Sequence, residues 1–209
     1  MPSRWRVFIA AWICAGIFEV LVAIKTGIWI AALMPLGWLG CLGSVDQLGP
    51  DPGKALVDAL GLWALRLLLL TLSLRPLRDL TGLSAFMRVR RLVGLFCWFY
   101  ATLHFGAAIF YVIGYSWDDL VRAFGDKTYI VLGLAAWLLL LSLAATSNRW
   151  SQLRLKRRWV YLHRFIYVAV IFACAHFLWL VRSDYWESVL YALGGLFLLM
   201  WRAQKISVW

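Results

Sequence analysis

The sequence predicts an all-α integral membrane protein, a helical bundle with six or seven transmembrane helices. Of its 209 residues, 64% are hydrophobic and only 15% are charged, whereas a soluble domain has nearer half and a quarter. The mean hydropathy is +0.79, and several apolar stretches approach the roughly 20 residues that a helix needs to cross a bilayer. So apolar a chain cannot cover its own surface with polar groups, which excludes a water-soluble globule.

Five apolar spans follow Asp51, at 59–74, 92–114, 128–146, 159–181 and 185–201. Before them, the stretch from Val7 to Cys41 is almost uninterrupted and too long for one crossing of a core about 30 Å thick. A break near Lys25 gives one or two crossings there. The sequence therefore predicts an N-terminal hydrophobic segment, 1–50, followed by a transmembrane bundle, 51–205.

Charges outside the spans predict the orientation, because basic residues concentrate on the cytoplasmic side. The basic residues gather in three segments: Arg75, Arg78, Arg88, Arg90 and Arg91; Arg149, Arg154, Lys156, Arg157 and Arg158; Arg202 and Lys205. The other connections carry most of the acids and are expected to face outward. The net charge of +11 is thus a topology signal, and membrane lipid rather than nucleic acid is the expected partner. The side of the N-terminus stays open, because Arg4 and Arg6 favour the cytoplasm while two crossings before Asp51 would place them outside.

All three histidines of the chain fall within two of these spans, His104 in 92–114 and His163 and His176 in 159–181. Both spans start after an Arg-Arg pair and are expected to run in the same direction. An imidazole in hydrocarbon is costly without a partner, so such residues are functional candidates. Neutral imidazole binds heme iron, and helix bundles house cofactors between facing helices. Interhelical hydrogen bonding is the alternative role.

Depth along the helices favours one pair of histidines. The Arg-Arg pairs that end at Arg91 and Arg158 serve as a common depth mark for the two spans. Counted from that mark at about 1.5 Å per residue, His104 is offset from His176 by about 7.5 Å and from His163 by about 12 Å. His104 and His176 are therefore the expected axial ligands of an outer heme. On an ideal helix His163 and His176 point about 140° apart, so two hemes require a distorted helix or different azimuths.

The inner position has a single histidine, His163. A second heme with one protein ligand, an unusual second ligand such as a nearby arginine or Cys97, and no second heme all stay open. Heme propionates would give buried cations a role, and Arg66, inside its span, and Arg164, beside His163, are the candidates. The four cysteines lie in apolar runs without CxxC spacing and are expected to be small buried hydrophobes.

Three runs carry a resemblance to a known family. They are DPGKALVDALGLWALRLLLLTLSLRPLR (Asp51–Arg78), RRLVGLFCWFYATLH (Arg90–His104) and RRWVYLHRFIYVAVIFACAHFLWLV (Arg157–Val181). In order and spacing they resemble the MsrQ (YedZ) family of heme-binding membrane subunits, within the ferric reductase-like transmembrane superfamily. The likeness runs from about Leu33 to the last span. The chain departs from the superfamily in having three histidines where four are usual.

The resemblance implies a function. MsrQ proteins relay electrons across the bacterial inner membrane to MsrP, a periplasmic molybdenum enzyme that reduces methionine sulfoxide in oxidised proteins. Heme b, in one or two copies, is the implied cofactor, and FMN is associated with the family. The implied donors are a cytoplasmic flavin reductase or the quinone pool. The matching heme-ligand positions are His104, His163 and His176. The resemblance also implies an electron-transfer subunit rather than a catalyst on its own.

Two alternatives remain at this point. One is a self-standing transmembrane ferric or oxygen reductase built on the same bundle. The other, from a different class, is a transporter in which histidines shuttle protons or solute. A transporter predicts acids at membrane depth, and apart from Glu19, and Glu187 at the start of the last span, the spans contain none. A purely structural subunit is a third reading, in which the histidines would be replaceable. No dinucleotide-binding glycine motif is present, so the electrons must come from another protein.

Overall fold

The computed structural model describes residues 51–114, 116–181 and 185–206, which are helical almost throughout. The expected N-terminal crossings fall on 1–50, outside the described residues. Residues Gly53–Trp209 form one compact unit. The predicted all-α membrane fold is confirmed, and the described bundle supplies the helices discussed below.

Within the described residues, four helical segments are long and apolar enough to cross a bilayer. They are α3 (Pro52–Thr81), α4 (Ala85–Ala108) with the π-helical η2 (Ile109–Ile113), α6 (Thr128–Ala145), and α8 (Arg157–Arg164) with α9 (Ile166–Leu180). They match the first four predicted spans. The fifth span corresponds to α10 (Tyr185–Ile206), whose 22 residues give a length of about 33 Å. Two short helices, α5 (Trp117–Asp126) and α7 (Arg149–Leu155), connect them.

The helices run further than the apolar spans predict. Instead of ending near residue 74, α3 continues past Arg75 and Arg78 to Thr81, and α4 already begins at Ala85. Arginine permits this extension because its aliphatic stem covers apolar surface while its charged head reaches water. Gly82, with φ +74°, terminates α3 in the left-handed region that glycine tolerates. The first arginine-rich segment is therefore mostly helical rather than a loop.

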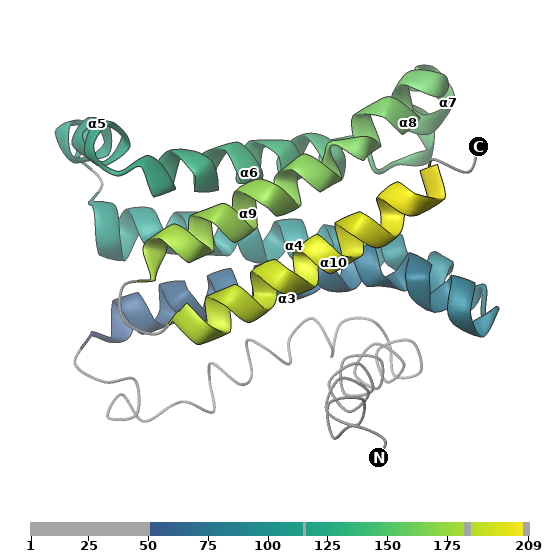
Figure 1. Ribbon diagram of the computed structural model, residues 1–209. Helices are drawn as coiled ribbons and strands as arrows, with labels where there is room; N and C mark the ends of the chain where they lie inside the picture. The colour runs from purple at the N-terminus through teal and green to yellow at the C-terminus, as the bar shows by residue number, and fades with distance from the viewer. Residues whose placement is uncertain (1–50, 115, 182–184, 207–209) are drawn as a thin grey trace, which may run out of the picture. The chain divides into compact units, whose positions relative to one another are not determined.

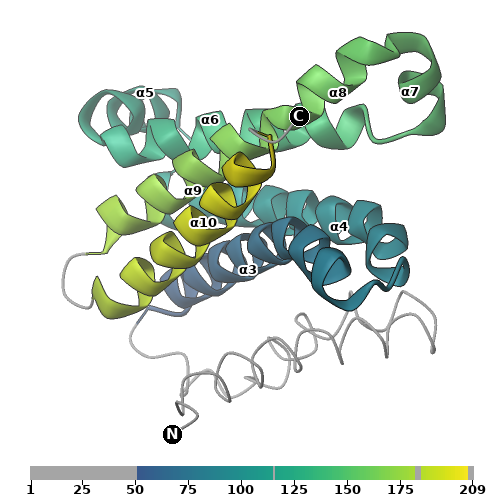
Figure 2. The ribbon, with the colours of Figure 1, turned by 45° about the vertical axis from the view of Figure 1, so that its right-hand side comes forward.

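Two helices run against the other three in the described bundle. The ribbon shows α4 and α9 running from one end of the bundle to the other in the same direction, and α3, α6 and α10 in the opposite direction (Figure 1). In both ribbon views α6 and α9 lie side by side (Figures 1 and 2). Small residues permit this approach, since Ala136 and Ala169 are buried where the two helices face each other. The core consists of Leu68, Leu72, Cys97, Leu140, Ala169 and Val170.

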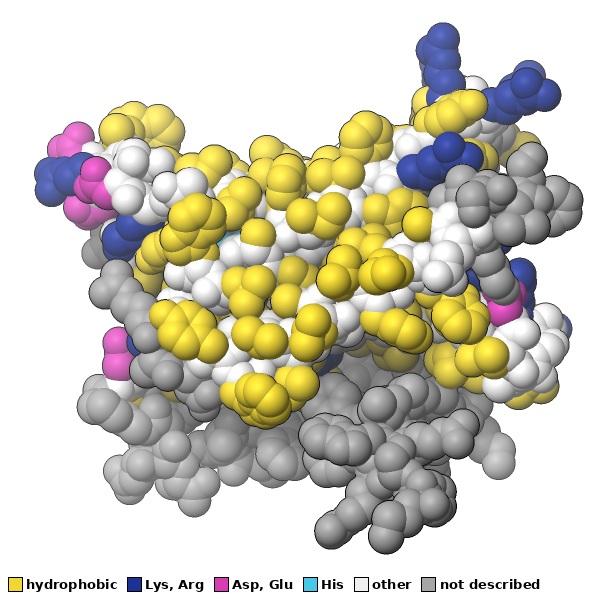
Figure 3. Space-filling view, viewed as in Figure 1, with side chains coloured by type: hydrophobic (Ala, Val, Ile, Leu, Met, Phe, Trp, Pro, Cys, Tyr) yellow, Lys and Arg dark blue, Asp and Glu magenta, His cyan; other side chains and the backbone are white. Residues whose placement is uncertain are grey.

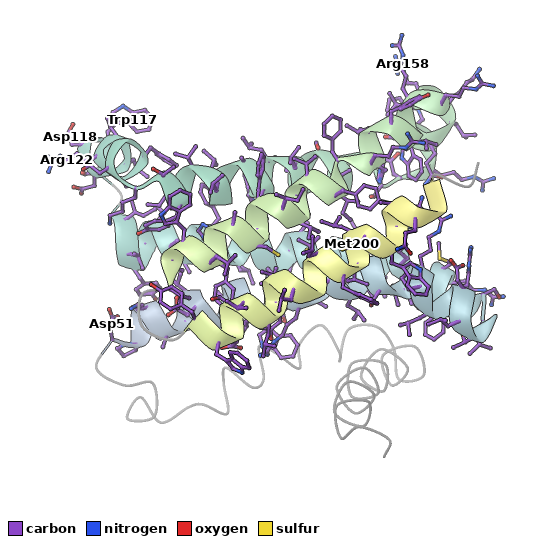
Figure 4. All side chains as sticks on the ribbon, in the orientation of Figure 1. Asp51, Trp117, Asp118, Arg122, Arg158 and Met200 are labelled. Carbon is purple, nitrogen blue, oxygen red and sulfur yellow. The ribbon has the colours of Figure 1, made fainter. Side chains whose placement is uncertain are left out.

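The two ends of the bundle differ in charge. Figure 3 shows Lys and Arg gathered mainly at one end and Asp and Glu mainly at the other, with yellow apolar side chains between them. We call these the arginine-rich end, marked by Arg158, and the acidic end, marked by Asp51 and Asp118 (Figure 4). The apolar zone carries exposed Leu138, Ile171 and Phe197, as expected for surface in contact with lipid.

The short helix α5 closes the acidic end. Figure 1 shows it nearly end-on, so it lies across the direction of the long helices. Ser116 caps it by accepting a hydrogen bond from the backbone N–H of Asp119 at 3.1 Å. Trp117 and Val121 are exposed, which is typical of an amphipathic helix at a membrane surface. The bundle below it is thereby covered at this end.

Candidate heme-binding site

His104 on α4 and His176 on α9 face each other. Their ring centroids are 6.2 Å apart and the ring planes are nearly perpendicular, at 80°. They come from the two parallel helices, so both lie nearer the acidic end of the bundle. The structure thus brings together the two histidines that the depth argument paired.

Each imidazole is held by one backbone carbonyl. The Nδ1 atom of His104 lies 2.9 Å from the carbonyl oxygen of Val57, and that of His176 lies 2.6 Å from the carbonyl oxygen of Tyr129. A carbonyl only accepts, so Nδ1 carries the proton in both rings. Nε2 therefore keeps its lone pair. This arrangement is typical of metal-binding histidines, in which the second ring nitrogen donates to a carbonyl and fixes the tautomer.

A glycine makes room for each ring. A Cβ atom on Gly61 would lie 2.8 Å from Cε1 and Nδ1 of His104, and one on Gly133 would lie 2.9 Å from the same atoms of His176. In both helices the glycine follows the accepting carbonyl by four residues, so it sits one turn along on the same face. Any residue larger than glycine at position 61 or 133 would therefore occupy space that a histidine ring fills.

The two halves of the site form an internal repeat, in which most lining positions have a counterpart at one constant spacing along the chain. The pairs that line the cavity at this spacing include Val57 and Tyr129, Gly61 and Gly133, Leu62 and Leu134, Ala64 and Ala136, Leu65 and Trp137, Leu68 and Leu140, Ala101 and Ala173, His104 and His176, and Phe105 and Phe177. The hairpin of α3 and α4 thus supplies one half, and α6 with α9 the other. Position 91, the counterpart of His163, is an arginine.

A cavity of about 1130 Å³ lies between the two halves. Its walls are mainly apolar, and alanines at positions 64, 101, 108, 136 and 173 keep them far apart. Phe105 stacks on Trp137 with ring centroids 4.9 Å apart, and Trp137 donates from Nε1 to the hydroxyl of Thr102 at 3.1 Å. At the acidic end the lining becomes polar and holds two lysines, Lys54 and Lys127, together with three acids, Asp58, Asp126 and Glu187.

The residues of this cavity fit a heme. Imidazole nitrogens bind metals at about 2.0–2.1 Å, so two rings that share one metal have centroids about 6 Å apart. The observed 6.2 Å agrees. The cavity has the apolar walls that a porphyrin needs, and two neutral imidazoles are suitable axial ligands. The rings are bonded to carbonyls, yet there is room for a macrocycle beside them.

His163 lies apart from this pair. It belongs to α8, and Phe165 separates α8 from α9, so the helix carrying His163 and His176 is interrupted between them. Its Nε2 lies 3.2 Å from the hydroxyl of Thr146, and its ring stacks on Trp159 with centroids 4.0 Å apart. His163 does not line the large cavity.

The two arginines expected near heme propionates do not line the cavity. Arg66 turns toward α10, where it donates from Nε to the hydroxyl of Tyr191 at 2.7 Å and lies 3.8 Å from Glu187. Arg164 is exposed, with its guanidinium over the ring of Tyr161. The roles assigned to them stay predictions.

Cys97, considered above as an unusual ligand, points elsewhere. It is 1% exposed, and its thiol donates to the carbonyl of Ala64 at 3.4 Å. Cys97 and Cys174 are free thiols, whereas Cys14 and Cys41 lie outside the described residues.

Sequence reasoning missed the glycines and lysines of the site. Gly61 precedes His104 by the same number of positions as Gly133 precedes His176, and this matched spacing was the available signal. Lys54 and Lys127 lie outside the predicted spans. No pattern in the sequence distinguishes them from other exposed lysines.

Comparison with known proteins identifies the family. A family model described as "Ferric reductase like transmembrane component" matches residues 60–174. Proteins named "Protein-methionine-sulfoxide reductase heme-binding subunit MsrQ" are 43% identical over 191 residues in Xanthomonas axonopodis pv. citri (strain 306) and 43% identical over 193 residues in Xanthomonas oryzae pv. oryzae (strain MAFF 311018). These alignments cover 88% and 90% of this chain and 88% of each relative.

The chain belongs to the MsrQ family of ferric reductase-like transmembrane components. The matched region of this MsrQ family member starts in α3 and ends in α9. It contains both glycines of the site, His104 and His163, and it stops two residues before His176. The family assignment and the fold class drawn from the sequence are thereby confirmed.

Proposed function

We propose that this protein is a heme-carrying membrane subunit that relays electrons to a methionine sulfoxide reductase. The observation that carries the proposal is the pair His104 and His176, two imidazoles at 6.2 Å with Nδ1 of each bonded to a carbonyl. The name of the relatives, a heme-binding subunit of protein-methionine-sulfoxide reductase, supports the same function. The protein makes or breaks no substrate bond itself.

The residues of the chain have separate roles in this proposal. His104 and His176 would hold the heme through Nε2, and the carbonyls of Val57 and Tyr129 hold the Nδ1 protons, which raises the basicity of both imidazoles. The apolar walls exclude water. When bound, heme b supplies a one-electron couple between ferric and ferrous iron.

Lys54 and Lys127 line the polar end of the cavity beside Asp58, Asp126 and Glu187, and these two lysines are the cations there that would suit heme propionates. With His104 and His176 both as ligands, a heme would have no open position, which would disfavour oxygen activation. This observation favours a relay over the self-standing oxygen reductase. His163 and Arg164 stay candidates for a second, inner heme, and the chain supplies one histidine there.

The finer details of the relay belong to the proposal as well. We infer an inner-membrane location with the arginine-rich end in the cytoplasm, because basic residues concentrate on that side. Electrons would enter there from a flavin reductase or the quinone pool, with FMN as a candidate cofactor, and leave at the acidic end for an MsrP-like molybdoenzyme in the periplasm. The family resemblance supports these partners.

Heme content and electron delivery test the proposal. The protein is purified in detergent from cells supplied with heme precursor, and oxidised and reduced visible spectra are recorded for the wild type, His104→Ala, His176→Ala and His163→Ala. We expect the first two variants to lose the outer heme and the reduction of a methionine sulfoxide reductase in membranes. His163→Ala should keep the outer heme.

Retention of the wild-type spectrum by both His104→Ala and His176→Ala would refute the site. A wild-type protein without heme would refute the relay itself. Gel filtration of each variant checks that the bundle is folded, and Cys174→Ala is a matched control on α9, two residues before His176.

A further inference from the structure

A second feature of the bundle is a narrow crevice at the arginine-rich end, between α3, α4, α9 and α10. Three arginines line it, Arg75 on α3, Arg90 on α4 and Arg202 on α10. The wall also contains Tyr167 and Asp79. It shares no lining residue with the heme cavity, so its role is a separate question.

Two of these arginines carry buried donors without acceptors. The Nε atoms of Arg75 and Arg202 are buried and have no hydrogen-bond partner within the described part of the chain. A buried, unsatisfied donor on a charged group is costly, and native structures usually satisfy such groups with protein, water or a ligand. The two donors come from different helices and belong to residues that line the same crevice.

The charges around the crevice do not balance. Asp79, the acid of the lining, receives two hydrogen bonds from Arg78, at 2.6 and 3.1 Å. Arg75 is repelled by both Arg202 and Arg78 and attracted by Asp79, so three arginines share one acid there. Side chains of like charge converge at one point only when something compensates them. An anion with several acceptor oxygens would satisfy the free Nε–H groups and the excess charge together.

We propose that Arg75, Arg90 and Arg202 form a binding site for a phosphate group. Guanidinium binds carboxylate and phosphate in the same bidentate geometry, and the carboxylate of the lining, Asp79, is already bonded to Arg78. The crevice has a volume of about 20 Å³, which admits one water or one phosphate oxygen. The phosphorus therefore sits at the mouth, with one oxygen inserted between Arg75 and Arg202.

The position of the site indicates where the phosphate comes from. Arg75 lies six residues before the end of α3, and Arg202 four residues before the end of α10, so both stand within about 6–9 Å of the helix ends. This is the depth of lipid headgroups in a bilayer-spanning bundle. A phospholipid headgroup and a soluble phosphate share this chemistry, and the experiment separates them.

The experiment measures phospholipid binding by native mass spectrometry of the delipidated full-length protein in detergent. Phosphatidylglycerol is titrated into the wild type, Arg75→Gln and Arg202→Gln. We expect one saturable high-affinity lipid on the wild type and about tenfold weaker binding to each variant, since loss of one charge-assisted hydrogen bond corresponds to at least that factor. Arg158→Gln, at an exposed position of the same end, is the matched control and should bind within about twofold of the wild type.

Further measurements distinguish a lipid headgroup from a soluble phosphate and test the role of the Nε–H donor of Arg75. Diacylglycerol, which lacks the phosphate, should not occupy the site. Displacement of the lipid by inorganic phosphate would assign the site to soluble phosphates, and retention would assign it to the lipid headgroup. Arg75→Lys keeps the charge but removes the Nε–H donor, so it should bind as weakly as Arg75→Gln.

Equal phosphatidylglycerol binding to the wild type, Arg75→Gln and Arg202→Gln would overturn the proposal, as would equal binding of diacylglycerol. Full recovery by Arg75→Lys would overturn the role of Nε. Circular dichroism and the outer-heme spectrum check that each variant is folded.

Discussion

Replacing Gly61 or Gly133 by alanine places a methyl group in space that an imidazole occupies. On Gly61 the added Cβ atom would lie 2.8 Å from His104, and on Gly133 it would lie 2.9 Å from His176. Ordinary van der Waals contact begins at about 3.4 Å, so each ring must retreat by several tenths of an ångström. The retreat stretches the hydrogen bond from Nδ1 to the carbonyl and moves Nε2 away from its binding position.

The magnitude follows from the cost of overpacking. An extra methyl group in a well-packed core costs about 1–3 kcal/mol. If that cost falls on the ligand-bound state, heme affinity drops by about 5- to 150-fold. Gly61→Ala and Gly133→Ala should give similar losses, because the two positions are equivalent in the internal repeat. The double variant should lose most of its heme.

Heme retained per chain, measured by absorbance during dialysis against a heme-scavenging globin, checks this prediction. Midpoint potential by redox titration is a second readout that a purely structural change would not move. Gly106→Ala is the matched control, since a Cβ there meets nothing within 4 Å and alanine favours the helix. Wild-type heme retention and potential in both Gly61→Ala and Gly133→Ala would refute the argument that glycine positions the rings.

Two further predictions test other contacts. The facing imidazole planes are nearly perpendicular, at 80°, so electron paramagnetic resonance of the oxidised protein should show a low-spin signal with a large maximal g value; a rhombic spectrum typical of parallel planes would contradict this geometry. Tyr191→Phe removes the acceptor of the 2.7 Å hydrogen bond from Arg66 and should lower the free energy of unfolding by about 1–3 kcal/mol, measured as thermal unfolding in detergent, with heme content unchanged. An unchanged melting temperature would show that Arg66 finds another acceptor.

The pairing of His104 with His176 was predicted from residue counts along the sequence, but their separation was not. Counting residues from two Arg-Arg pairs left the histidines offset by about 7.5 Å in depth, yet their rings meet at 6.2 Å. Residue counts assume straight helices parallel to the membrane normal, whereas the helix that carries His176 is interrupted at Phe165. A distorted helix was one of the two expected ways to place two irons on one helix, the other being different azimuths.

The partner of Arg66 and the cavity position of Lys54, by contrast, do not follow from the local sequence. An arginine within an apolar span indicates an anionic partner, and a protein acid, Glu187, lies 3.8 Å away on α10. Which helix faces Arg66 is not encoded in the local pattern, so a propionate and a glutamate were equally reasonable partners. Lys54 lines the cavity although its local sequence resembles any loop.

The sequence by itself determined the membrane class, the spans and the identity of the candidate ligands, because apolar length and the scarcity of intramembrane imidazole are local, countable properties. Only the tertiary structure decided which nitrogen is available, which glycines make room for the rings and where the unsatisfied arginines meet. Those features depend on contacts between residues far apart in the chain, such as the carbonyl of Val57 with His104, and such contacts are set by helix packing rather than by any short pattern.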